Sequence, residues 1–197
     1  MPFPSPPWPM RGQMWLSLFR AGPPEGPHGL WGAAWVSYQP GSALTYSELL
    51  VARPVRVRDG RRVTIRDIWV DSVPSRDGGR ALWGIPKDLA AFRHDESGLG
   101  PVRRTSWSAG TVDGQPIASA QLADATGLAP VRLPFRAATW QRRDGGGEVQ
   151  ARMGGRTRAL PCLAHWDFSA EGPLGWLAGK QPLASFRLRD FEMDFGR

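Results

Sequence analysis

The sequence has little of the residue types on which many catalytic centres depend: one cysteine, three histidines and, among 25 basic residues, only two lysines. A single thiol, Cys162, excludes an internal disulfide framework and a cysteine-based zinc site. His28, His94 and His165 share no metal-ligand spacing, so no metal site is predicted. A G-x-S-x-G nucleophile elbow is missing, and the glycine clusters at 78–79 and 145–147 fit neither a P-loop nor a dinucleotide-binding motif.

Long apolar runs are also missing. The segment 30–36, LWGAAWV, is among the longest, which is far too short to span a bilayer. The first ten residues, MPFPSPPWPM, have neither the basic nor the apolar region of a secretory signal, so a cytoplasmic protein is expected. The net charge of +7 comes from scattered arginines, and no nucleic-acid-binding motif accompanies them. Neither a nucleic acid nor a membrane is therefore predicted as a partner.

Glycine and proline are abundant, with 24 and 19 residues, which favours short strands joined by turns over long helices. Residues 1–10 are predicted to form a proline-rich extended lead-in. Alternating patterns predict strands, with Asp59-Gly60 as a hairpin turn. Two short helices are expected at 75–83 and 172–180, and one helical turn at 88–92. The predicted strands are 13–20, 30–38, 46–58, 62–70, 101–109, 116–122, 131–140, 148–153, 157–168 and 184–195.

These elements predict an α+β fold that is mainly antiparallel β, a single domain over 1–197 centred on a β-barrel with a few short helices. Pro54 interrupts the strand over 46–58 and is expected to mark an edge or a bulge.

Lys87 is the most distinctive candidate for chemistry. Where a positive charge suffices, this chain uses arginine, whereas lysine can lose its proton and form a Schiff base. In ALWGIPKDLA (81–90) the lysine lies among Trp83, Ile85, Pro86 and Leu89. Burial among such side chains would lower its pKa toward neutrality. The alternative is a surface lysine whose stem covers apolar neighbours.

Three segments together resemble the acetoacetate decarboxylase family: YSE (46–48), WVDS (69–72) and GGRALWGIPKDLA (78–90). The resemblance is strongest over residues 45–92. It implies a barrel-centred, oligomeric α+β protein in which Lys87, the lysine of the segment G-R-x-x-x-x-P-K (79–87), is the Schiff-base lysine. It also implies that Glu48 of the Y-x-E motif and Arg11, before the first strand, belong to the active site, and that Asp71 is structural.

The activity implied is a cofactor-independent carboxy-lyase that decarboxylates a β-keto acid of the acetoacetate type, with a small keto acid as its partner molecule. The lysine amine would form a protonated imine with the ketone, and that cation would accept the electrons released with carbon dioxide. Glu48 would handle protons or position the acid. Arg11 would orient the substrate carboxylate or supply a neighbouring cation.

This chain departs from the family pattern in ways that affect the pocket. Asp88 follows Lys87 where well-known decarboxylases have a second lysine, although adjacent side chains of an extended segment point to opposite faces. Ile85 replaces a typical tyrosine. A more apolar pocket is therefore expected, with Trp31, Trp35, Trp83 and Ile85 lining it.

Three alternatives to the decarboxylase stay open from the sequence. Schiff-base aldolase-dehydratase chemistry on pyruvate-type substrates would use the same lysine. A non-catalytic ligand-binding member of the fold is a second alternative, with Asp88 as a mark of lost activity. A basic nucleic-acid-binding module is the least supported.

Overall fold

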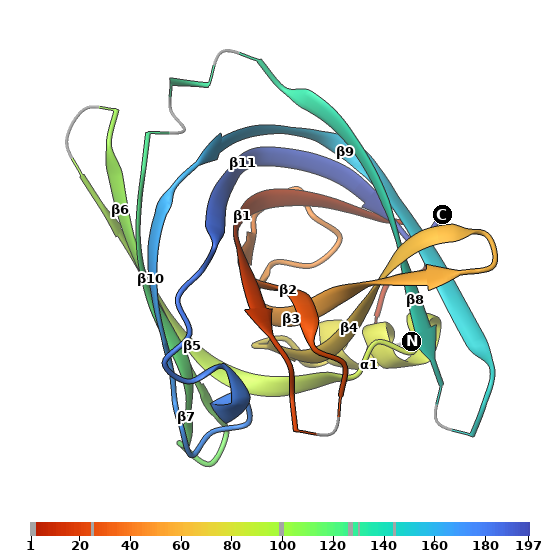
Figure 1. Ribbon diagram of the computed structural model, residues 1–197. Coiled ribbons are helices and arrows are strands. Elements are labelled where there is room, and N and C mark those ends of the chain that lie inside the picture. Colours follow the sequence, from red (N-terminus) through yellow and green to blue (C-terminus); the bar gives the residue numbers. More distant parts are fainter. Residues whose placement is uncertain (1–2, 25, 99–100, 126–127, 130, 144) are drawn as a thin grey trace.

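Eleven strands, one α-helix and one 3₁₀ turn make up a computed structural model that describes residues 3–24, 26–98, 101–125, 128–129, 131–143 and 145–197 (Figure 1). The helix is α1 (Val73–Trp83) and the turn is η2 (Gly175–Leu177). The strands are β1 (Trp8–Ala21), β2 (Gly29–Tyr38), β3 (Tyr46–Val57), β4 (Gly60–Val70), β5 (Lys87–Ser97), β6 (Arg103–Thr111), β7 (Pro116–Asp124), β8 (Leu133–Arg142), β9 (Glu148–Pro161), β10 (Leu163–Phe168) and β11 (Ala184–Phe195).

Seven of the strands close into a barrel in the order β4-β3-β2-β1-β11-β9-β8. Neighbours along this path are antiparallel, and a parallel pairing of Val63 in β4 with Thr139 in β8 closes the ring. The Asp59-Gly60 turn joins β3 to β4, as the sequence predicts. The mainly antiparallel, barrel-centred α+β fold is confirmed.

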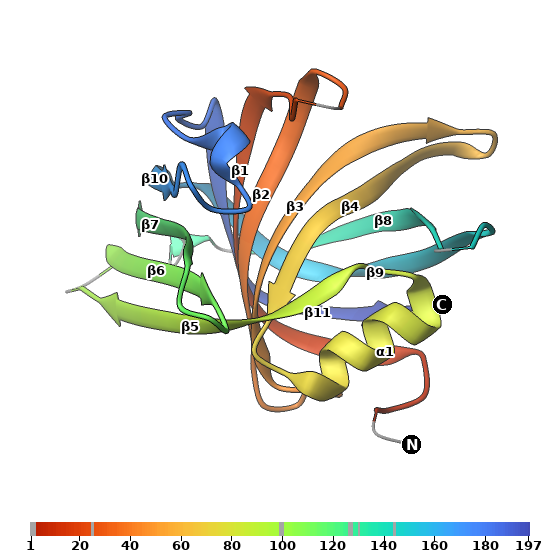
Figure 2. The same ribbon diagram turned by 90° about the horizontal axis from the view of Figure 1, so that it is seen from below.

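The other four strands form a second sheet that continues from β4. Strand β5 pairs in parallel with the end of β4, from Ile68–Lys87 to Val70–Leu89, and β6, β7 and β10 follow it. Figure 2 shows this sheet on the left, and β8 and β9 on the opposite side of the molecule. Because the second sheet covers the outer surface of this part of the barrel, consecutive residues are buried in β2 and in the first half of β3, whereas the buried positions of β1 change from even to odd numbers after Gly12.

Two hydrophobic cores result, separated by these strands. The tryptophan core lies between the barrel wall and the second sheet, where Trp35 stacks between Trp107 and Trp166 with ring centroids 5.4 and 5.5 Å away. The barrel core lies on the other face and contains Trp8, Met10, Val36, Tyr38, Tyr46, Ile68, Val70, Trp83, Ile85, Ala151 and Phe191.

Helix α1 packs on β4, β5 and β9 and has well-defined ends. The Ser72 side chain accepts from the Ser75 N–H at the start, which satisfies one of the free donors of the first turn. Gly84 ends the helix in the left-handed conformation, at φ 60°. Trp83 packs edge-on against Trp8 and Phe195, so segments from both ends of the chain lie against the helix.

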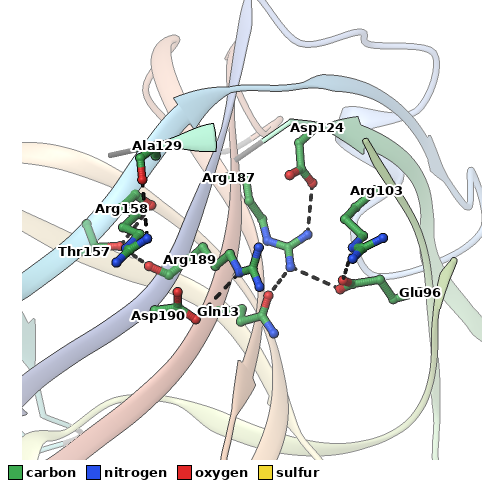
Figure 3. Close-up of polar contacts among 10 residues, drawn as sticks. All are labelled: Gln13, Glu96, Arg103, Asp124, Ala129, Thr157, Arg158, Arg187, Arg189 and Asp190. Carbon is green, nitrogen blue, oxygen red and sulfur yellow. Dashed lines mark hydrogen bonds and ion pairs between the residues drawn. The ribbon is translucent and has the colours of Figure 1, made fainter. Parts of the chain in front are cut away.

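An arginine network joins the second sheet to the barrel (Figure 3). Arg187 of β11 is only 1% exposed, and its guanidinium lies 3.0 Å from Asp124 of β7 and 3.1 Å from Glu96 of β5. It also donates to Gln13 of β1, and it lies 3.9 Å from the ring centroid of Trp15. One buried cation thus holds three strands around it.

Three sequence predictions of local structure are wrong. Residues 88–92 are not a helical turn but part of β5, because β4 and β6 both supply backbone partners. The two strands predicted over 148–153 and 157–168 are divided instead at Cys162, because β9 runs on through Gly154 and Gly155 to pair with β11. The helix predicted over 172–180 is only the single turn η2.

Two further sequence expectations are met at least in part. The helix predicted over 75–83 is α1. Pro54 lies within β3, opposite Val63, and the bulge occurs two residues earlier, between Val51 and Ala52. Among the described residues, no helix is long and apolar enough to cross a membrane.

Candidate active site

Lys87 is the first residue of β5, and its side chain enters the barrel core. The register pairs it with Ile68, whose side chain belongs to that core. Only 6% of the Lys87 side chain is exposed. A buried ammonium is costly unless it is paired and hydrogen-bonded, so its partners decide its protonation state. The surface-lysine alternative is therefore wrong.

Three oxygen atoms surround the Lys87 amine. Nζ donates to Glu48 Oε2 at 2.8 Å, to Ser75 Oγ at 2.9 Å and to Tyr46 Oη at 3.1 Å. An ammonium group has three N–H donors, so the three acceptors match its full capacity. The partners come from β3 and α1, and both elements are needed to complete the site.

Glu48 links the amine to a second phenol. Its side chain is 4% exposed, and Oε1 accepts a hydrogen bond of 3.2 Å from the Tyr38 hydroxyl while Oε2 faces Lys87. The Tyr38 and Tyr46 rings pack together with centroids 4.5 Å apart. Burial, followed by the nearby Glu48 charge, raises the pKa of Tyr38 well above its usual value, so that phenol stays a proton donor.

The pKa of Lys87 is raised above its ordinary value of 10.5. Desolvation acts strongly to lower it, but the Glu48 charge and the neighbouring Tyr46, with their hydrogen bonds, together outweigh burial. The expectation of a pKa lowered toward neutrality is wrong for this state of the protein. Lys87 and Glu48 rest as a buried ammonium–carboxylate pair, and Glu48 is the base nearest to the amine.

Helix α1 approaches this pair through two adjacent glycines. A Cβ atom at Gly79 would lie 2.8 Å from Cδ of Lys87, and one at Gly78 would lie 2.7 Å from the Trp8 ring. Each glycine costs about 1 kcal/mol relative to alanine in a helix interior. Here they let the helix backbone pack closely against the lysine stem on one side and a tryptophan on the other.

Asp88 points away from the amine. Its side chain is 69% exposed and lies 3.6 Å from Arg80, whose Nε donates to the Lys87 carbonyl at 2.5 Å. The extended conformation of β5 separates adjacent side chains, as expected from the sequence. Asp71 accepts a hydrogen bond of 2.7 Å from the Ser47 N–H, beside Glu48, which fits the structural role expected for it.

The structure does not bring Arg11 to Lys87. Arg11 is 58% exposed, and its guanidinium lies 3.7 Å from Glu192. Along β1, the side chains of Trp8 and Met10 face the barrel core. Adjacent side chains of a strand point to opposite faces, so Arg11, which follows Met10, faces outward. A role for Arg11 at the amine is not favoured by this position.

The four residues expected to line the pocket divide between the two cores. Trp83 and Ile85 belong to the barrel core, together with Tyr38 and Tyr46. Trp31 and Trp35 belong to the tryptophan core, on the opposite face of β2. The latter two therefore pack the second sheet against the barrel and do not line the Lys87 site.

Sequence reasoning did not identify Tyr46, Ser75 or Tyr38 as members of the site. A signal for Tyr46 was present, because residues i and i+2 of a strand share a face and Tyr46 stands two before Glu48. Tyr38 pairs with Tyr46 across β2 and β3. Ser75 depends on how α1 packs against β5, which no local pattern reveals.

Comparison with known proteins agrees with this fold and motif. The sequence model described as acetoacetate decarboxylase matches residues 23–140, more than half of the chain, including Glu48 and Lys87. Among curated proteins, none matches the sequence significantly.

Several solved structures share the fold at low sequence identity. Acetoacetate decarboxylase from Legionella pneumophila has a TM-score of 0.64 at 15% identity, covering 99% of this chain and 86% of its own. An acetoacetate decarboxylase-like enzyme from Sphingomonas wittichii also gives 0.64, at 16% identity, covering 98% and 91%. The enduracididine biosynthesis enzyme MppR gives 0.65 at 15% identity, covering 100% and 88%. The family match over more than half of the sequence, supported by the shared fold, shows that this chain belongs to the acetoacetate decarboxylase family.

Proposed function

We propose that this protein is a Schiff-base-forming lyase that decarboxylates a β-keto acid, with Lys87 as the nucleophile. The observation that carries the proposal is the buried amine of Lys87, held by Glu48, Tyr46 and Ser75 in the barrel core. The family membership supports it. A buried lysine beside a carboxylate has both a nucleophile and a base for its proton, as imine formation requires.

The first proposed step is activation of the amine. Glu48 takes one proton from the Lys87 ammonium, and the free electron pair on Nζ attacks the ketone carbon of the substrate. Loss of water from the resulting carbinolamine gives a protonated imine. Tyr46 and Ser75, which accept from the ammonium at rest, can donate their hydroxyl protons to the carbinolamine oxygen.

The second step breaks the bond between the α-carbon and the carboxylate. Its electron pair moves toward the iminium nitrogen, carbon dioxide leaves and an enamine forms. A proton is then added to the α-carbon, for which protonated Glu48 is the nearest described acid. Water adds to the new imine and releases the ketone, which restores the Lys87–Glu48 pair. The hydroxyl group that gave its proton to the carbinolamine oxygen takes one back from solvent, which is the one proton that the overall reaction consumes. The proposed chemistry uses no cofactor.

Aldol or dehydration chemistry on a pyruvate-type substrate is the second candidate. MppR shares the fold and has been solved with pyruvate, and with the condensation product of pyruvate and imidazole 4-carboxaldehyde. Such chemistry would begin with the same imine at Lys87. It differs from decarboxylation in the bond that changes afterwards.

Reductive trapping tests both candidates. The chain is incubated with acetoacetate or with pyruvate, borohydride is added, and the modified peptide is identified by mass spectrometry. Lys87→Arg is the test variant. Lys180→Arg is the matched control, because Lys180 is the other lysine of the chain and is exposed. A label on Lys87 that survives the control substitution supports imine chemistry.

The mass of the trapped group identifies the reaction. An isopropyl group from acetoacetate means that carbon dioxide left before reduction, whereas a retained carboxylate means that it did not. In a further incubation with pyruvate and an aldehyde together, a larger adduct that contains both supports the second candidate. If neither acid labels Lys87, and a broader set of ketones also fails, the non-catalytic binding function is the better description.

The family resemblance also leads us to propose that the protein is a homo-oligomer in the cytoplasm and acts on a small keto acid without a nucleic-acid or membrane partner. Light scattering of the purified chain tests the oligomer directly. A monomer at micromolar concentration would contradict it.

A further inference from the structure

A cleft of about 680 Å³ opens on the outside of the Lys87 site, where the barrel wall divides. Strands β4 and β8 pair at Val63 and Thr139 and then diverge. Beyond that point the cleft is bounded by β4, β8 and the turn from α1 to β5. Its volume is typical of sites for small organic ligands. Its lining residues are Thr64, Ile65, Arg80, Ala81, Gly84, Ile85, Pro86, Trp140, Gln141, Arg142 and Arg143.

Gln141 bridges the gap between the diverging strands. Its Oε1 accepts from Thr64 Oγ1 at 2.8 Å and from the Ile65 N–H at 2.9 Å, and its Nε2 donates to the Ile65 carbonyl at 2.9 Å. The side chain therefore takes the place of backbone pairing between β4 and β8. The base of the cleft is fixed, not a loose gap between two strands.

The charge of the cleft has one sign. Arg80, Arg142 and Arg143 line it, and the lining residues in the described part of the chain include no aspartate or glutamate. Like charges gathered in a concave surface repel one another and raise the local concentration of anions. The composition of this wall therefore favours a negatively charged ligand.

Two of the three arginines are fixed by the fold. Arg143 donates to the carbonyls of Ala81 and Leu82 in the last turn of α1, at 3.3 and 3.2 Å. Arg80 donates to the Lys87 carbonyl and lies 3.6 Å from Asp88, which offsets part of its charge. Guanidinium groups that are already ordered lose little conformational entropy when an oxyanion binds.

Arg142 is not fixed by hydrogen bonds in this way. It is exposed, and in the described residues no ion pair or hydrogen bond of its side chain is found; its guanidinium carbon lies 5.8 Å from the ring centroid of Trp140. The Trp140 ring also lines the cleft, but its Nε1 donor is buried and is not open to a ligand there. Among the described residues that line the cleft, Arg142 is thus an arginine whose bonding capacity the fold leaves unused, beside an indole ring.

The remaining wall is apolar. Ile65, Ile85 and Pro86 line the cleft beside Trp140, and Ile85 also belongs to the barrel core that holds Lys87. Ile85 therefore contacts both the cleft and the core of the candidate active site. A ligand that used all of these surfaces would carry an acidic group on an apolar body.

We propose that this cleft is a binding site for an organic acid. The carboxylate of the acid binds Arg142 and Arg143, and its apolar part packs on Ile65, Pro86 and the Trp140 ring. That this acid is the keto-acid substrate on its way to Lys87 rests on the proposed function; binding in the cleft does not. The favoured substrates would then be acids with an apolar or aromatic chain longer than that of acetoacetate.

The test uses three probes that carry no ketone and so cannot form an imine. 3-Phenylpropionate has both the carboxylate and the apolar body, 3-phenylpropanol has only the body, and inorganic phosphate supplies only an oxyanion. Binding is followed by calorimetry and by the indole N–H resonances in a ¹⁵N spectrum, in which Trp140→Phe identifies the Trp140 signal. The acid is expected to bind one per chain, to shift that signal, and to bind at least about tenfold more tightly than either other probe.

Variants decide whether the cleft is the site. Arg142→Gln is expected to weaken binding of the acid about tenfold or more, which is the scale of losing one charged hydrogen bond. Arg93→Gln is the matched control, because Arg93 is exposed on β5 outside this cleft, and it should bind normally. Lys87→Arg should also bind normally, so loss of imine chemistry and loss of cleft binding are separate results.

Three outcomes would overturn the proposal: binding of the acid that leaves the Trp140 signal unmoved, equal binding by Arg142→Gln and wild type, or phosphate binding as tightly as 3-phenylpropionate. The last would mean a general anion site with no preference for organic acids. A trapping experiment that fails while the acid still binds in an Arg142-dependent way would contradict the proposed function and leave the cleft site standing.

Discussion

The Lys87 amine and the Glu48 carboxylate lie 2.8 Å apart although 39 positions separate them in the sequence, and both are almost fully buried. The pair forms because β5 begins beside the end of β4, which is itself paired with β3 at Glu48. Its consequence is a lysine that rests protonated, with its proton acceptor already in contact.

Replacing Glu48 by glutamine is expected to lower the pKa of Lys87. The nearby Glu48 charge is the largest influence that raises it, so burial, which lowers it, would then dominate. The borohydride-trapping yield on Lys87, followed against pH, should rise at a lower pH than in wild type. Glu192→Gln, which changes an exposed partner of Arg11, is the control. An unchanged profile would show that Glu48 does not set the charge of the amine.

Stability should fall in alkaline solution. The folded-state pKa of Lys87 is raised above 10.5, so its contribution is fully present below that value and is lost as the pH rises through the folded-state pKa. The raised pKa values of Tyr38 and Tyr46 act in the same direction. Urea unfolding measured from neutral pH to above 10.5 should show the loss. The double variant Lys87→Met, Glu48→Gln should lose less than wild type, and Lys180→Met should match wild type.

Gly79→Ala should reduce activity although alanine is the better helix former by about 1 kcal/mol. The added Cβ would lie 2.8 Å from Cδ and 3.0 Å from Cε of Lys87, so the lysine stem or the helix must move. Trapping on Lys87 is expected to fall at least about tenfold, since misplacing a reacting group is costly. Asp77→Ala, two positions earlier on α1 and partly exposed, is the control. Normal trapping by Gly79→Ala would mean that the helix can shift without cost.

Arg187→Met should destabilise the protein by about 3–5 kcal/mol, because it removes the buried cation that faces Asp124 and Glu96. Arg189→Met is the matched control: it is two residues along the same strand, but its partner Asp190 and its own side chain are both over one-third exposed. The control should cost less than about 1 kcal/mol. Equal losses in urea unfolding would contradict a special role for the Arg187 network.

Arg11→Gln is expected to leave imine formation within about twofold of wild type, because Arg11 pairs with Glu192 at the surface and faces away from the barrel core. The rate of trapping by acetoacetate under subsaturating conditions measures this. A large fall would mean that Arg11 acts on the substrate before it reaches Lys87, a role the family resemblance implies.

Much of the β structure could be predicted from the sequence, because period-two alternation and the Asp59-Gly60 turn are local signals. The choice of Lys87 rested on the rarity of lysine and on the family resemblance. The segment 87–97 was missed, since it is a strand only through pairing with β4 and β6. Membership of the site depends on which face of a strand meets which core, and Trp31 and Trp35 look no different in sequence from residues that line a pocket. The raised pKa of Lys87 was missed for the same reason: Glu48 was expected in the site, but its contact with the amine, together with those of Tyr46 and Ser75, depends on the packing of β3 and α1 against β5.

Odd-numbered and even-numbered positions of β1 to β3 contribute side chains to different cores. In β1 to β3 the barrel-core residues are even-numbered, among them Met10, Tyr38 and Tyr46, whereas Trp15, Trp35 and Val51 of the tryptophan core are odd-numbered. The register keeps this numbering in step across all three strands. A library restricted to even positions would therefore vary the surroundings of Lys87, and one restricted to odd positions would vary the attachment of the second sheet. Inserting a single residue in β2 would exchange the two sets and abolish both properties together.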